Sequence, residues 1–209
     1  MPHENTPVYS TGAKLDEATS AMILLHGRGA SAEDILSLAM HIDHPGMLYL
    51  APQADGALWY PNRFLAPVEQ NEPDLSAALN VIARLINYVE EAGIATDKIY
   101  LGGFSQGASL ASEYVIRNPQ RYGGLFVFSG CFIGPLDWDR QPNGDLNGMP
   151  AFIGCSDRDP YFPVQRVQQT SALLQAMHAE VTERIYPNMG HTINGDEIEL
   201  ARSIVEKSL

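Results

Sequence analysis

The chain has 209 residues, of which 45% are hydrophobic and 18% are charged, and its formal net charge is −12. This length suits one domain over residues 1–209 that buries about 70% of its unfolded surface. The acidic balance argues against nucleic acid or an anionic membrane as partner, and no apolar run reaches the roughly 18 residues of a membrane span. Residues 1–5 lack the features of a signal peptide, so we expect a cytoplasmic protein.

Short apolar runs alternate with amphipathic ones along the chain. The predicted elements, in chain order, are a ragged strand at Val8–Tyr9, a strand at Ala21–Leu25, a helix at Ser31–His41, a strand at Met47–Ala51, a helix at Pro73–Glu91, a strand at Ile99–Leu101, a helix at Gln106–Arg117, strands at Gly124–Phe128 and Ala151–Ile153, a helix at Val164–Ala179, a strand at Val181–Tyr186 and a helix at Gly195–Lys207.

Strands that are short, wholly apolar and separated by helices predict an α/β fold with a mostly parallel central sheet and helices on both faces. The chain leaves little length for a separate cap domain, so we expect none. Functional sites in such sheets lie at the carboxyl ends of the strands. Two stretches, Pro52–Glu72 and Gly130–Pro150, fit no regular element and are expected to be functional loops.

The strongest motif follows the strand at Ile99–Leu101. The sequence Gly-Phe-Ser-Gln-Gly at 103–107 places Ser105 between a strand and a helix, which is the pattern of a nucleophile elbow. The serine occupies a sharp, strained turn, and a side chain two residues before or after it would collide with the backbone. We therefore predict that Ser105 is a catalytic nucleophile. The alternative is a glycine-rich turn without a catalytic role.

A second glycine-rich turn, His26-Gly-Arg-Gly at 26–29, follows the strand at Ala21–Leu25. Acyl transfer requires two donors aimed at the developing oxyanion. We predict that the backbone N–H groups of Arg28 and Gln106 are these donors. His26 precedes the serine in the chain and is expected to brace this loop instead of acting as a base.

The acid and the base are expected after the last two strands, because α/β-hydrolases order their triads as serine, acid and histidine. Asp157 and Asp159 both follow the strand at Ala151–Ile153, and the residues alone leave the acid open between them. His191 follows the strand at Val181–Tyr186 and is the predicted base. His178 falls inside a predicted amphipathic helix, where a solvated surface position is expected.

The sequence contains no metal-binding or nucleotide-binding motif, so we expect neither a metal site nor a cofactor. Cys131 and Cys155 are expected to be buried small hydrophobic residues and not nucleophiles.

With these motifs in place, nearly the whole chain resembles the phospholipase/carboxylesterase family of small α/β-hydrolases, which includes the acyl-protein thioesterases. The similar segments are Leu24–Gly29, Gly102–Ala108, Asp157–Pro163, Met189–His191 and Ala51–Gln53 with Trp59 and Tyr60. The resemblance implies that Asp159 is the catalytic acid and that Trp59 and Tyr60 line the acyl site. Arg28 departs from the family, because an apolar residue is common there in the thioesterases.

The predicted function is hydrolysis of small carboxylic esters by a Ser105–His191–Asp159 triad through an acyl-enzyme. A thioesterase, a lysophospholipase or a hydrolase of a catabolic lactone or ester would use the same site. A non-catalytic binding protein that keeps the fold is the alternative from another class. Apolar side chains of the two long loops could line an acyl pocket or form a homodimer interface; they are Trp59, Tyr60, Phe64, Leu65, Phe132, Ile133 and Trp138.

Overall fold

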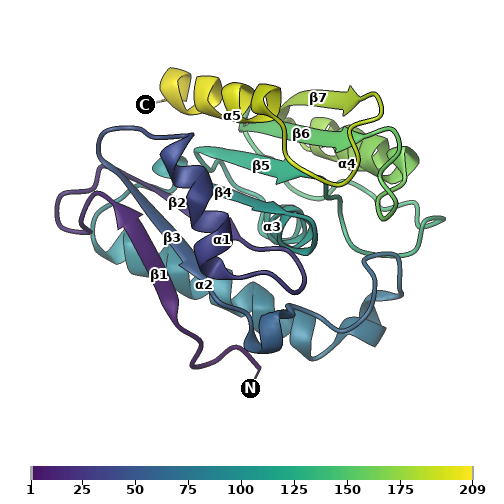
Figure 1. Cartoon of the computed structure of the whole chain (residues 1–209), viewed down its shortest axis with the longest axis horizontal. Helices are drawn as coiled ribbons and strands as arrows, with labels where there is room; N and C mark the ends of the chain where they lie inside the picture. The colour runs from purple at the N-terminus through teal and green to yellow at the C-terminus, as the bar shows by residue number, and fades with distance from the viewer. Residues whose placement is uncertain (1, 209) are drawn as a thin grey trace.

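The computed structural model of the chain describes residues 2–208, and within them seven strands form one sheet in the order β1-β3-β2-β4-β5-β6-β7 (Figure 1). The strands are β1 (Val8–Gly12), β2 (Ser20–Leu25), β3 (Met47–Pro52), β4 (Ile99–Phe104), β5 (Gly124–Phe128), β6 (Pro150–Ser156) and β7 (Glu180–Tyr186). β1 pairs antiparallel with β3, and every other pairing is parallel. This confirms the mostly parallel α/β sheet, and the carboxyl ends of the parallel strands share one edge.

Helices cover both faces of the sheet (Figure 1). The α-helices are α1 (Ala32–Leu36), α2 (Asp74–Glu91), α3 (Gln106–Arg117), α4 (Val164–Ala176) and α5 (Gly195–Ser208). One buried apolar cluster joins the sheet to α2, α3 and α4, and a second joins it to α1 and α5. The central strands β2 and β5 are buried throughout because each is covered on both faces, whereas β1 lies exposed at the sheet edge.

The predicted elements are present, and two helices differ from the prediction in length. The helix expected over 31–41 is a short α1 followed by a 3₁₀ turn at Ser37–Met40. The helix expected to reach Ala179 ends at Ala176, and His178 lies in the following turn with a φ of 62°. His178 is still exposed, so the expected solvated position holds although its place inside a helix was wrong.

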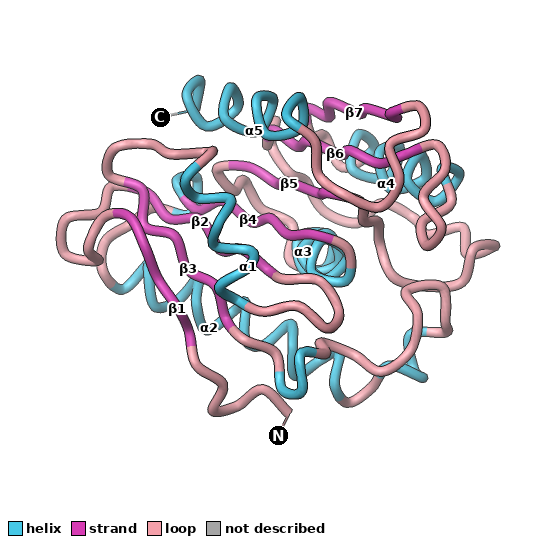
Figure 2. Tube along the Cα trace, viewed as in Figure 1, coloured by secondary structure: helices cyan, strands magenta, loops and turns pink. Residues whose placement is uncertain are grey.

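The stretch between β3 and α2 is loop except for two short 3₁₀ helices, Asp55–Ala57 and Val68–Asn71 (Figure 2). Its first half returns to the carboxyl ends of β2 and β4, so it contributes directly to the site described below.

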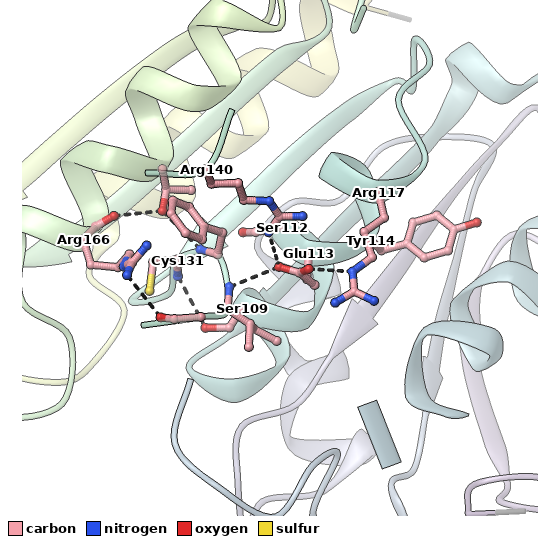
Figure 3. A network of polar contacts seen from close by, with 12 residues as sticks. Ser109, Ser112, Glu113, Tyr114, Arg117, Cys131, Arg140 and Arg166 are labelled. Atoms are coloured by element: carbon pink, nitrogen blue, oxygen red, sulfur yellow. Dashed lines mark hydrogen bonds and ion pairs between the residues drawn. The ribbon is translucent and has the colours of Figure 1, made fainter. Parts of the chain in front are cut away.

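The second long loop, residues 130–149, is held in place by an ionic network around the buried Glu113 (Figure 3). The fully buried Glu113 carboxylate of α3 accepts hydrogen bonds from Arg117 Nε at 2.6 Å and from Arg140 at 2.7 Å. The same carboxylate accepts the backbone N–H of Ile133 at 3.1 Å. From α4, Arg166 donates to the carbonyls of Gly134 and Pro135. The network therefore ties this loop to α3 and α4.

This placement corrects one expectation about the second loop. Phe132 and Ile133 are buried in the core, and Trp138 packs edge-on against Phe132 at a centroid distance of 6.2 Å. None of the three lines the cavity beside Ser105. The apolar side chains of this loop therefore stabilise packing between α3 and α4 and do not form the predicted acyl pocket.

Candidate active site

Ser105 occupies the sharp turn between β4 and α3. Its backbone has φ 57° and ψ −117°, a conformation that a non-glycine residue adopts only when its surroundings impose it. The flanking glycines are required because this turn lies against the end of β2. A Cβ at Gly103 would lie 2.6 Å from the Leu25 carbonyl oxygen, and one at Gly107 would collide with the carbonyls of Leu25 and His26. The glycine spacing is thus explained by contact between backbones.

His191 joins Ser105 to Asp159. Its Nε2 lies 3.0 Å from Ser105 Oγ, and its Nδ1 lies 2.7 Å from Asp159 Oδ2. The Asp159 side chain is fully buried, and the His191 side chain is 16% exposed. With Nδ1–H donating to the carboxylate, Nε2 is left as an acceptor for the serine hydroxyl proton.

The second carboxylate oxygen of Asp159 is fixed by the backbone. Oδ1 accepts the N–H groups of Tyr161 at 2.8 Å and of Phe162 at 3.0 Å. Burial raises the pKa of Asp159, but the hydrogen bonds from His191 and from these two N–H groups outweigh it and hold the pKa below its ordinary value. Asp159 is therefore ionised at neutral pH and cannot rotate freely.

Asp157 has a different position. Its Oδ1 accepts the Asn188 backbone N–H at 2.7 Å, and the residue is exposed. Of the two aspartates that the residues alone left open, the structure therefore brings only Asp159 to His191. Asp157 instead stabilises the loop that carries His191.

Two further anchors hold the His191 loop. Ser156 Oγ accepts the Gly190 N–H at 3.1 Å. Asn194 and Glu197 exchange hydrogen bonds between side chain and backbone at 2.8 and 3.0 Å, which caps the start of α5.

Aromatic rings also surround the His191 imidazole: the ring centroid of Phe104 lies 4.7 Å from it and that of Tyr161 4.9 Å. The ring orientation of His191 is therefore determined by packing as well as by hydrogen bonds.

The two predicted oxyanion donors lie beside Ser105 in one cavity. Gln106 is the first residue of α3, so its N–H has no acceptor inside the helix, and Arg28 lies in the turn after β2. Within residues 2–208 neither N–H has a hydrogen-bond acceptor. Both groups are available to a developing oxyanion.

Side chains of the same two residues organise the first long loop. The Arg28 guanidinium donates to three successive carbonyls, those of Tyr60 at 3.0 Å, Pro61 at 3.1 Å and Asn62 at 2.8 Å. The Gln106 amide accepts the Trp59 N–H at 3.0 Å and donates to the Tyr60 carbonyl at 2.8 Å. Sequence reasoning did not assign either side chain a role. Each one ties the loop at 59–62 to the turn that carries a candidate oxyanion donor.

His26 braces the loop, as expected. It is fully buried, its Nε2 accepts the Ala54 N–H at 3.0 Å, and its Nδ1 lies 2.8 Å from the Gly27 carbonyl. Burial lowers the pKa of His26 below its ordinary value, so the ring is neutral. Its carbonyl accepts the Trp59 indole N–H at 2.9 Å. His26 therefore contacts the first long loop and not Ser105.

The cavity beside Ser105 has a volume of about 330 Å³, and five Phe or Tyr residues contribute to its walls. Its lining residues are Gly27, Arg28, Ala30, Tyr60, Asn62, Arg63, Phe64, Phe104, Ser105, Gln106, Tyr161, Phe162 and His191. Tyr60 lines it as predicted, whereas the fully buried Trp59 does not. Sequence reasoning missed Phe104, Tyr161 and Phe162, although each lies within or beside a motif that it identified.

The two cysteines lie apart from this chemistry. Both are free and buried, and burial raises the pKa of each thiol, that of Cys155 to about 12. A neutral buried thiol is a poor nucleophile, which agrees with the structural role expected for both residues.

Within residues 2–208, no group of three or more His, Cys, Asp or Glu side chains could hold a metal ion. No helix in this part of the chain has both the length and the apolarity needed to cross a bilayer.

The chain is similar to proteins of one known family. The family model described as phospholipase/carboxylesterase matches residues 8–209. Acyl-protein thioesterase 1 of Saccharomyces cerevisiae is 28% identical over 224 residues, covering 94% of this chain and 96% of the yeast protein.

Two crystal structures show the same fold. A phospholipase/carboxylesterase from Dyadobacter fermentans superposes with a TM-score of 0.91 at 39% identity, covering 97% of each chain. The Bacillus cereus carboxylesterase superposes with a TM-score of 0.78 at 21% identity, covering 99% of this chain and 96% of that one.

Proposed function

The chain belongs to the phospholipase/carboxylesterase family and is a hydrolase of carboxylic esters, and we propose that it acts through an acyl-enzyme on Ser105. The observation that carries this proposal is the chain of two hydrogen bonds from Ser105 through His191 to Asp159, at 3.0 and 2.7 Å. Serine activation requires this order of groups, with the strained turn exposing the hydroxyl.

In the first half-reaction Ser105 Oγ attacks the ester carbonyl carbon while His191 Nε2 accepts the hydroxyl proton. Asp159 holds Nδ1 protonated and stabilises the imidazolium. The N–H groups of Arg28 and Gln106 donate to the oxyanion, each lowering the barrier by about 3 kcal/mol. His191 then protonates the leaving alcohol as the carbon–oxygen bond breaks.

In the second half-reaction water replaces the alcohol. His191 accepts a proton from water, the hydroxide attacks the acyl carbon, and the collapse of the second tetrahedral intermediate returns the proton to Ser105. The products are one carboxylic acid and one alcohol. Every step uses side-chain and backbone groups of this chain, the ester and water.

The cavity volume favours short acyl groups. A volume of about 330 Å³ lies at the lower end of the 300–1,000 Å³ typical of small-molecule sites. Phe64 and Phe162, which stack at a centroid distance of 4.4 Å, form a rigid wall beside the acyl site. We therefore place the preferred substrates among small esters.

A thioesterase activity is the second candidate, and the similarity to acyl-protein thioesterase 1 of yeast favours it. The same triad cleaves an ester or a thioester, because both reactions proceed through an acyl-enzyme. Lysophospholipid hydrolysis would place a longer acyl chain in a cavity of this volume, and the cavity disfavours it.

The test is hydrolysis of p-nitrophenyl esters from acetate to palmitate, with the matching acyl thioesters measured in parallel. We expect turnover of the short esters by the wild type and a loss of at least about 10⁴-fold in Ser105→Ala. Equal turnover by Ser105→Ala would refute the proposal. An inert wild type would favour the alternative of a non-catalytic binding protein.

Three further expectations stay predictions: one domain over residues 1–209, a cytoplasmic location and a possible homodimer. Size-exclusion chromatography with light scattering tests the last of these.

A further inference from the structure

The charge of the cavity differs in sign from that of the whole protein. The chain carries 25 acidic and 13 basic side chains, Lys and Arg together. In the described part of the chain, however, the cavity is lined by two arginines, Arg28 and Arg63, and by no aspartate or glutamate. We call Arg28 and Arg63 the arginine pair. A cleft lined by one sign of charge concentrates ligands of the opposite sign.

Within residues 2–208 the arginine pair has no carboxylate partner. The arginines that form ion pairs there lie elsewhere, at Arg117, Arg140 and Arg202. Arg28 and Arg63 instead donate to backbone carbonyls. Their positive charges are therefore not neutralised by a neighbouring anionic side chain.

The two members of the pair differ in rigidity. Arg28 is fixed by its three hydrogen bonds to the carbonyls of residues 60–62. A guanidinium has five N–H groups, so two of those of Arg28 remain without an acceptor in the described residues. Arg63 makes one long hydrogen bond, 3.4 Å to the Tyr161 carbonyl, and its side chain is exposed. Arg63 is therefore held by fewer hydrogen bonds than Arg28.

Aromatic side chains share the cavity with the arginine pair and Ser105. Phe104, Tyr161 and Phe162 line the same cavity and contact the His191 ring, at centroid distances of 4.7, 4.9 and 5.7 Å. The small cavity thus combines the reacting groups, aromatic side chains and two arginines that have no carboxylate partner in the described residues. A ligand matched to it has an ester group, a short apolar linker and a negatively charged end.

We propose that the substrates are small esters that carry a free carboxylate, which Arg63 binds while the fixed charge of Arg28 supports it. This inference rests on the proposed function and names its substrate class. A carboxylate suits the planar guanidinium fork, which binds two oxygens at once. The carboxylate belongs to the acyl part or to the alcohol part of the ester, and the experiment distinguishes the two.

Two matched ester pairs test the proposal. For the acyl part, the pair is mono-p-nitrophenyl glutarate and its methyl ester, which differ at the far end by a charge and a methyl group. For the alcohol part, the pair is 4-acetoxybenzoate and its methyl ester. The quantity measured is the ratio of kcat/KM for the anionic ester to kcat/KM for the neutral one.

The wild type is expected to prefer the anionic ester about tenfold or more in at least one pair. Arg63→Gln should lower that ratio about tenfold. Arg184→Gln is the matched control, because Arg184 is exposed on β7 and outside the cavity, yet its substitution removes the same charge. A wild-type ratio near one in both pairs would overturn the proposal, as would equal effects of the two variants.

A binding measurement separates this inference from the proposed function. Calorimetry of glutarate with Ser105→Ala needs no catalysis, and we expect binding that weakens about tenfold with Arg63→Gln added and also weakens at high salt. Ester turnover without any charge preference overturns the inference and leaves the proposed function standing. Glutarate binding that depends on Arg63, in a protein that turns over no ester, would support the anion site and overturn the proposed function.

Discussion

Replacing Asp159 with asparagine should hold His191 in the wrong tautomer. Oδ1 of Asp159 accepts two backbone N–H groups, from Tyr161 at 2.8 Å and from Phe162 at 3.0 Å. An amide nitrogen cannot accept those bonds, so the amide oxygen must take this place. The amide nitrogen then occupies the position of Oδ2, 2.7 Å from His191 Nδ1, and donates to it.

With Nδ1 as an acceptor, the imidazole proton moves to Nε2. His191 Nε2 lies 3.0 Å from Ser105 Oγ and could no longer accept the serine proton. The same substitution in the triad of a well-studied serine protease leaves the geometry intact and lowers kcat about 10⁴-fold. We expect a loss of this order here, or about 5.5 kcal/mol of transition-state stabilisation.

The assay is steady-state hydrolysis of a short p-nitrophenyl ester by Asp159→Asn and by the matched variant Asp157→Asn. Asp157 accepts the Asn188 N–H at 2.7 Å, and an amide oxygen can replace that acceptor. We expect Asp157→Asn to lose less than about fivefold, because a neutral hydrogen bond differs from a charged one by about 1 kcal/mol. Thermal unfolding controls for misfolding. Similar losses in the two variants would refute the assignment of the acid.

Three stability predictions follow from other buried contacts. Gly103→Ala places a Cβ 2.6 Å from the Leu25 carbonyl oxygen and should lower the free energy of unfolding by about 3 kcal/mol. Gly195→Ala places its Cβ in open space and should change the free energy of unfolding little. Equal values for the two variants would contradict this reasoning. Glu113→Gln leaves two arginines facing a neutral amide and should lower the free energy of unfolding, measured in urea, by about 3–5 kcal/mol. A loss below about 1 kcal/mol would be inconsistent with a buried ionic network. Burial raises the pKa of Glu197 from 4.5 to about 7, so the folded chain binds a proton that the unfolded chain releases, and stability falls as pH rises through this window. Glu197→Gln should remove that decline, about 2.5 kcal/mol between pH 5 and pH 8, and an unchanged decline would show that another group causes it.

Local sequence signals predicted the sheet, and the structure brings the side chains of Ser105, His191 and Asp159 together. Apolar runs and helical spacing indicate strands and helices because these patterns depend on near neighbours in the chain. Ser105 and His191 follow strands, and parallel strands bring their carboxyl ends to one edge. The residues alone did not choose between Asp157 and Asp159, because that choice depends on which carboxylate faces His191.

Contacts between distant parts of the chain account for the errors. Trp59 was expected at the acyl site, but its indole N–H donates to the His26 carbonyl and buries the ring in the core. Trp138 was one of the side chains that could line an acyl pocket or a dimer interface, but its loop is held near α3 and α4 by Glu113 and Arg140, which lie 27 positions apart. Sequence spacing carries no signal for such pairs.

The helix α4 ends three residues earlier than predicted for a different reason. Met177 and His178 follow Ala176 in a turn, and His178 adopts a left-handed conformation with φ 62°. Its neighbour Ala179 returns an N–H to the Leu174 carbonyl at 2.9 Å, which closes the helix. No glycine marks this helix end, so the sequence pattern predicted a helix that continues beyond it.

Covalent labelling with a fluorophosphonate, followed by peptide mass spectrometry, tests the central claim most directly. The reagent phosphonylates an activated serine and stays attached, so it reports the nucleophile itself. We predict one phosphonyl group per chain on Ser105, with labelling slowed at least about 10³-fold in His191→Ala. A label on another residue would contradict the proposed mechanism, as would an unlabelled Ser105 in a protein that still hydrolyses esters.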